Sequence, residues 1–180
     1  HPVPRPGEQE QRRGDLDDTL PLPDEDRTRI HTVSRQPRLA APAIEKQKRL
    51  ADRVHAKGAE VLMSSHAPNE ALPAEDVLDH LSDFVSRGAD IPKIVVRAET
   101  EDELLEAFRT TVLLKRSLSV PFVHLCCGRF GRLQRYVAPS LGAALTFGVR
   151  NSVQGPQPRV CDAARVLHEL NWHRPYPAVE

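Results

Sequence analysis

The chain has 180 residues, of which 39% are hydrophobic, and this is enough for one domain with a core. Its 25 basic and 25 acidic residues balance, so the charge favours neither nucleic acid nor an anionic membrane, and we expect a small-molecule or protein partner. No run approaches the ~18 apolar residues of a membrane span, and the N-terminus lacks the apolar stretch of a signal peptide. The three cysteines, two of them adjacent, form a poor disulfide framework, which favours the cytoplasm.

Residues 1–29 are rich in proline and charge. They contain five prolines and only four aliphatic side chains, so ordering them would bury little apolar surface. We therefore predict a disordered tail over residues 1–29, followed by one domain over residues 30–180.

After the tail, short β-branched runs alternate with longer amphipathic stretches. A weak strand at 30–34 precedes a helix at 43–57, which stops at Gly58 because glycine readily takes the left-handed conformation. The strand "EVLMSSH" ends on His66 and is followed by a helix from Pro73 to Gly88. Two strand and helix units are therefore predicted in the first half of the domain.

The second half continues the alternation. A strand within 88–99 carries Lys93, and the capping box of Thr100 and Glu103 starts the next helix. The remaining predicted elements are a strand at 122–127, a helix at 132–137, a strand at 144–149 and a helix at 160–172. The sequence thus predicts an α/β fold of about five βα units with parallel strands.

In a parallel sheet of this kind, ligands bind at the carboxyl ends of the strands. His66, Lys93 and the glycine turn that begins at Gly128 all fall at or near such ends. Residues that are tens of positions apart in the chain are therefore expected to meet around one site.

Lys93 is unusual because it interrupts an apolar strand. Either its side chain reaches solvent, or it lies among neighbours such as Ile91 and Val95. In the second case, loss of water would disfavour the ammonium, lower the pKa and leave a neutral amine as a nucleophile. The sequence by itself leaves both interpretations open.

Four sequence strings, taken together in their order and spacing, resemble a known family. The strings are "MSSH", "GADIPKI", "CCGRFGRLQR" and "LGAALTFG", and over residues 58–172 the chain resembles type I 3-dehydroquinate dehydratase. The resemblance implies a (βα)8 barrel that converts 3-dehydroquinate to 3-dehydroshikimate through a lysine Schiff base. It implies no metal, no nucleotide and no other cofactor.

By this resemblance, Lys93 is the lysine that forms the imine and His66 is the general acid and base. The iminium withdraws electrons and acidifies the neighbouring C–H, whose proton the imidazole can take and later give to the departing hydroxyl. Arg135 matches the arginine that holds the substrate carboxylate, for which its planar fork is suited, and Ser152 matches the serine of the last loop.

The chain also departs from the family pattern. A full barrel has about 250 residues and eight βα units, and the first three units have no counterpart here. In the last loop, Gln157 stands one residue later than the glutamine of the family pattern. Gln134 stands where the family has a serine, directly before the arginine that Arg135 matches. Three explanations follow: a truncated product, a chain that completes its barrel by association with itself or with the missing units, or a degenerate binding domain.

Two alternative functions remain. The first is a non-catalytic, metabolite-binding or regulatory module of the same fold. The second is a cysteine-dependent phosphatase, because Cys126 to Arg132 fits Cys-x5-Arg between a strand and a helix. Among the other histidines, His55, His80 and His168 are expected on helix surfaces, and His124 is expected to be packed rather than bound to metal.

Overall fold

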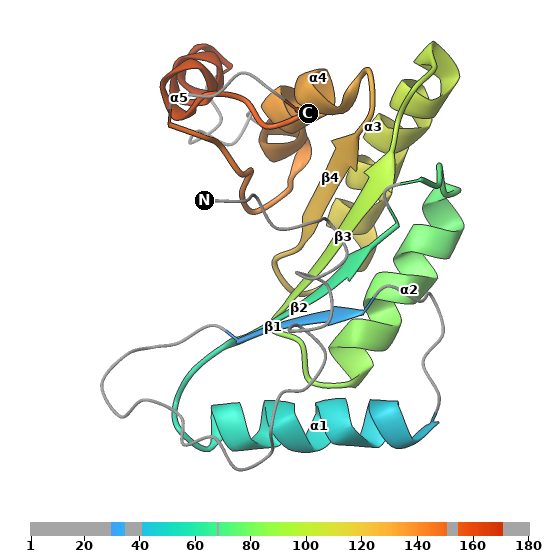
Figure 1. Cartoon of the computed structure of the whole chain (residues 1–180), viewed down its shortest axis with the longest axis vertical. Coiled ribbons are helices and arrows are strands. Elements are labelled where there is room, and N and C mark those ends of the chain that lie inside the picture. Colours follow the sequence, from blue (N-terminus) through green and yellow to red (C-terminus); the bar gives the residue numbers. More distant parts are fainter. Residues whose placement is uncertain (1–29, 35–40, 68, 151–154, 171–180) are drawn as a thin grey trace, which may run out of the picture.

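The structure is a computed structural model that describes the backbone of residues 30–34 and the residues 41–67, 69–150 and 155–170. The tail predicted at residues 1–29 lies outside these ranges, so the domain boundary at residue 30 stays a prediction. In chain order the elements are β1 (Ile30–Ser34), α1 (Ala41–His55), β2 (Val61–His66), α2 (Ala74–Ser86), β3 (Ile91–Arg97), α3 (Glu101–Ser117), β4 (Val123–Cys127), α4 (Gly131–Val137), the 3-10 helix η2 (Ala138–Leu141) and α5 (Val160–Glu169) (Figure 1).

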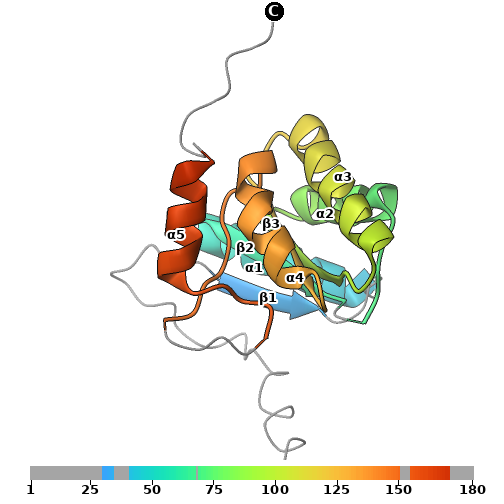
Figure 2. The ribbon, with the colours of Figure 1, turned by 90° about the horizontal axis from the view of Figure 1, so that it is seen from above.

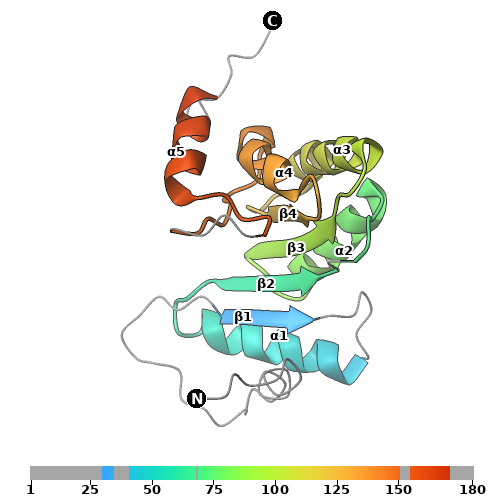
Figure 3. The same ribbon diagram turned by 45° about the horizontal axis from the view of Figure 1, so that its top comes forward.

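The four strands form one parallel sheet in the order β1-β2-β3-β4. The strands follow an arc with helices α1, α2, α3 and α4 outside it (Figure 3). Seen from above, α5 lies beside α4 and away from α2 and α3 (Figure 2). This is half of a barrel wall, and it confirms the predicted α/β class and the parallel strands.

Local signals in the sequence explain where the helices begin and end. Thr100 and Glu103 form the predicted capping box, in which each side chain bonds the backbone of the other. Gly58 follows α1 with a φ of 73°, the left-handed conformation expected of a residue without Cβ. The loop before β2, at Gly58, and the loop after β3, at Thr100, therefore lie within a few residues of their predicted positions.

Alternation along the strands separates two apolar clusters. Side chains such as Met63, Ile94 and Val96 face the helices and form the larger core with Phe84 and Leu114. The opposite face, called the inner face below, carries a smaller cluster. Its members are Leu62, Ile91, Val95, Val123 and Leu125.

The fifth strand predicted at 144–149 is wrong, and the structure shows the reason. Only Val149 forms a bridge there, with Arg159, rather than with the sheet. The free edge of β4 is instead occupied by the Gln134 side chain, whose Nε2 donates to His124 O at 3.0 Å and whose Oε1 accepts from Cys126 N at 2.9 Å. Because this amide reproduces the bonds of a neighbouring strand, little backbone at the edge is left for a fifth strand to pair with.

We expect Gln134→Met to destabilise the protein by about 2–4 kcal/mol, because the variant leaves one N–H and one C=O buried without these partners. The measurement is the free energy of unfolding in urea. Leu133→Met is the matched control, since the Leu133 side chain on the same helix is 47% exposed and makes neither bond. Equal stability of the two variants would contradict the edge-sealing role of Gln134.

Candidate active site

Lys93 lies in the middle of β3 and points to the inner face. It occupies the position between Ile91 and Val95, two members of the inner-face cluster, and the residue is only 7% exposed. Burial is the main cause that lowers the pKa of Lys93, and the positive charge of Arg135 lowers it further. Of the two interpretations that the sequence allows, the structure therefore favours a buried Lys93 whose pKa is lowered.

His66 ends β2 on the same inner face as Lys93. The two side chains meet, with His66 Nε2 3.3 Å from Lys93 Nζ. This contact joins residues 27 positions apart, because β2 and β3 are adjacent parallel strands whose carboxyl ends lie at the same edge of the sheet. A potential nucleophile and a potential proton carrier are thus within reach of one small molecule.

Arg135 is carried by α4 and is 4% exposed. Its Nε donates to Cys126 O at 2.9 Å, which ties the guanidinium to the end of β4 and fixes its plane. Burial lowers the pKa of Arg135, yet a guanidinium stays charged under ordinary conditions, so the site keeps one fixed positive charge. Such a charge favours an anionic group near the Lys93 amine.

Two further residues named in the sequence analysis, Ser152 and Gln157, belong to the last loop. Ser152, predicted to bind substrate, lies outside the described residues, and its role stays a prediction. Gln157 is half-buried, and its side chain lies against Gly155.

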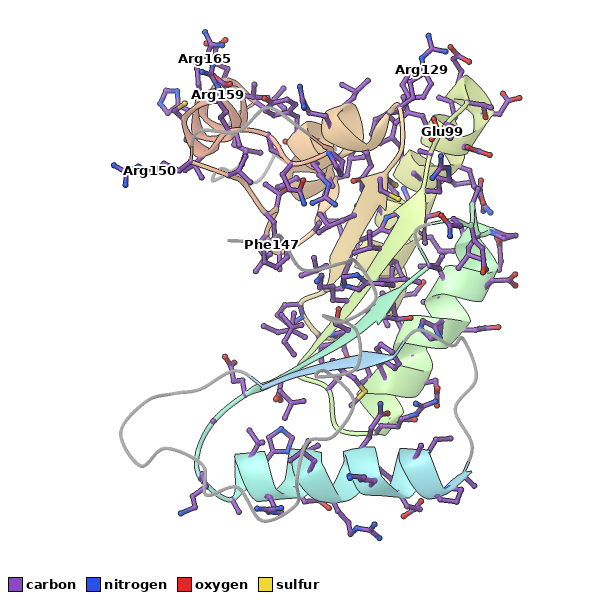
Figure 4. The ribbon with its side chains drawn as sticks, viewed as in Figure 1. Glu99, Arg129, Phe147, Arg150, Arg159 and Arg165 are labelled. Carbon is purple, nitrogen blue, oxygen red and sulfur yellow. The ribbon has the colours of Figure 1, made fainter. Side chains whose placement is uncertain are left out.

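Phe147 and Ser64 are two residues near Lys93 that the sequence analysis did not assign to the site. Phe147 places its ring centroid 4.9 Å from Lys93 Nζ, and Figure 4 shows its position beside the sheet. Ser64 is the register partner of Lys93 on β2, and its buried hydroxyl has no hydrogen-bond partner among the described residues. The alternation of β2 predicts the face of Ser64, whereas no sequence signal brings Phe147 from the 143–149 segment to Lys93.

The geometry around Cys126 opposes the phosphatase alternative. Burial raises the pKa of the Cys126 thiol to about 12, whereas a nucleophilic cysteine needs a lowered pKa. Arg132 would have to cradle a phosphate above that thiol, but it lies on the face of the helix opposite to Gln134, which bonds to β4, and its Nη2 donates to Gly155 O at 2.7 Å. His124 is fully buried and bonded to Thr111 Oγ1 at 2.9 Å, which confirms that it is packed.

Comparison with known proteins places this geometry in a family. The family model described as Type I 3-dehydroquinase matches residues 40–173. Among curated proteins, the 3-dehydroquinate dehydratase of Klebsiella pneumoniae is 30% identical over 108 residues, which cover 59% of this chain and 43% of that protein. The enzyme of the same name from Shouchella clausii is 30% identical over 134 residues, covering 73% of this chain and 51% of that protein.

Solved structures agree with the fold. The type I 3-dehydroquinate dehydratase of Clostridium difficile, solved with covalent modified comenic acid, superposes with a TM-score of 0.67 at 26% identity, covering 73% of this chain and 52% of that one. The 3-dehydroquinate dehydratase of Geobacillus kaustophilus gives a TM-score of 0.69 at 20% identity over 81% of this chain and 54% of that one. The chain therefore spans about half the length of the relatives that it matches.

A direct measurement of the Lys93 pKa tests the burial argument. We expect reductively ¹³C-methylated Lys93 to lose its proton at lower pH in the folded protein than in denaturing urea, because burial and Arg135 both disfavour the ammonium. The NMR signal is assigned by its absence in Lys93→Ala. A folded-state titration at or above the denatured-state pH would contradict the buried, weakly basic amine.

Proposed function

Because the chain belongs to the type I 3-dehydroquinase family, we propose that it dehydrates 3-dehydroquinate to 3-dehydroshikimate through an imine on Lys93. The observation that carries this proposal is the contact of 3.3 Å between the buried amine of Lys93 and the imidazole of His66. The matched relatives bear the name of this activity, although the chain spans only about half of their length.

The proposed reaction begins with the neutral amine of Lys93. Its lone pair attacks the substrate ketone, and the resulting carbinolamine loses water to form an iminium. His66 takes a proton from the carbon next to the iminium, and the electron pair forms an enamine. The enamine expels the hydroxyl, which His66 protonates to water, and hydrolysis of the iminium releases the product and the free amine.

Arg135 is proposed to hold the substrate carboxylate. Its Nε is engaged by Cys126 O, so the guanidinium is presented with a fixed plane, as a bidentate contact requires. The same positive charge helps to keep Lys93 unprotonated before the attack. Ser152 is proposed as a further substrate contact from the last loop.

The cell compartment and the assembly are further parts of the proposal. Within the described ranges, no helix has the length and hydropathy needed to cross a bilayer. We propose a cytoplasmic enzyme, because all three cysteines are free thiols. We also propose that the half-barrel works as an assembly, since β1 pairs only with β2 in the described sheet and an open strand edge invites pairing.

The imine is tested by adding 3-dehydroquinate and borohydride, followed by mass spectrometry of peptides. We expect a reduced adduct on Lys93, no adduct in Lys93→Ala, and an unchanged adduct in Lys115→Ala, which removes an exposed lysine on α3. Calorimetric binding of 3-dehydroquinate to wild-type protein without any adduct would favour the non-catalytic, metabolite-binding alternative.

His66→Gln separates imine formation from proton transfer. We expect this variant to give the Lys93 adduct but to lose turnover by about 10²–10⁴-fold, because the amine remains while the proton carrier is gone. Turnover of the variant close to that of the wild type would remove His66 from the mechanism.

Light scattering after size exclusion tests the assembly. We expect a dimer with twice the 20.1-kDa chain mass that dissociates on dilution, with dehydratase activity falling in parallel. A second copy is the proposed partner, and a missing-unit partner is the alternative. Activity that stays constant per chain in a monomer would contradict the need for association.

A further inference from the structure

A hollow lies between α4 and the turn at residues 155–156. It has a volume of about 520 Å³, and the residues that matter here are Arg129, Arg132, Leu133, Tyr136, Gly155 and Pro156. We call it the α4 pocket. The α4 side chains that line it, Arg132, Leu133 and Tyr136, lie on the opposite face of the helix from Gln134 and Arg135, which bond to β4.

The segment that carries the α4 pocket is rich in arginine, and two of its arginines, Arg129 and Arg132, line the pocket. Residues 128–170 contain six arginines, no lysine and two acidic residues, although the whole chain is neutral. One of the two acids, Asp162, is bonded to Arg159. Figure 4 shows Arg129 on one side of α4 and Arg159 with Arg165 on the other. An anion approaching this end of the molecule therefore meets an attractive field.

Glu99 is a carboxylate beside Arg129 that could oppose this charge. It accepts a hydrogen bond from the backbone N–H of Arg129 at 3.0 Å and forms an ion pair with Arg97. The Arg97 charge thus offsets that of Glu99. The side chain of Arg129 extends instead over the Phe130 ring, 5.2 Å from its centroid, and is exposed.

The walls of the α4 pocket are held in place. A Cβ added at Gly131 would lie 2.7 Å from Cys126 O and 3.0 Å from Pro156 Cβ, so the first turn of α4 packs directly on both. Phe130 N donates to Ala98 O at 3.0 Å, and Arg132 Nη2 donates to Gly155 O at 2.7 Å. A pocket whose lining is fixed before binding loses less entropy when a ligand enters.

We propose that the α4 pocket binds a phosphate monoester. Its dianionic phosphate lies against the guanidinium groups of Arg129 and Arg132, whose planar forks suit phosphate oxygens. Its organic part lies on Leu133 and Tyr136, since Leu133 is 47% exposed and gives the ligand an apolar wall beside the charges. Neither Lys93 nor His66 is among the residues that line this pocket.

Titration calorimetry with phenyl phosphate on the full chain tests the site. We expect saturable binding, about tenfold tighter than that of inorganic phosphate at equal ionic strength, because the ring adds contact with Leu133. Arg129→Ala is expected to weaken phenyl phosphate binding at least about tenfold, the loss of one charge-assisted contact. The matched control Arg116→Ala removes an exposed arginine on α3 and is expected to bind as the wild type does.

Two further variants locate the ligand. Leu133→Ala is expected to weaken phenyl phosphate but not inorganic phosphate, and Lys93→Ala is expected to leave both unchanged while abolishing the borohydride adduct. Loss of binding in Lys93→Ala would place the anion in the Lys93 site and overturn the proposal. The absence of saturable binding, equal weakening in Arg116→Ala, or equally tight binding of benzoate would overturn it as well.

Discussion

The burial of one amine on the inner face of the sheet governs the arrangement of the candidate site. Lys93 sits where an aliphatic residue would be expected, between Ile91 and Val95, and its charged form is disfavoured there. A structural lysine would be better accommodated in water, so this placement costs stability, and the imine chemistry that we propose would use the free base it favours. His66 and Arg135 are candidate site residues because His66 Nε2 lies 3.3 Å from the Lys93 nitrogen and the charge of Arg135 lowers the Lys93 pKa.

The edge of β4 is the second constraint, and it connects the fold to the site. Gln134 and Arg135 are neighbours on α4, and both bond to the backbone of β4, through His124 and Cys126. The same turn of α4 therefore supplies hydrogen-bond partners to the edge of β4 and holds the Arg135 guanidinium in position. A change that moves α4 to admit another strand would also move the positive charge that depresses the Lys93 pKa.

The sequence predicts the features that local periodicity encodes. The four paired strands, the capping box at Thr100 and the approach of His66 to Lys93 all follow from alternation and from the common edge of parallel strands. The strand at 144–149 was wrongly predicted because its β-branched and aromatic pattern is local, whereas the competitor for the edge is the side chain of Gln134. Phe147 was not assigned to the site because only tertiary packing brings its loop to Lys93.

The two edges of the sheet differ in a way that limits how copies of the chain can join. Edge β4 is sealed by side chains, while β1 pairs on one side only within the described sheet. A head-to-tail contact of β1 with the β4 of another copy would require that seal to break. The proposed pairing of β1 with β1 about a two-fold axis would need no such change and would leave no further edge of the described sheet open, so it would give closed pairs rather than fibres.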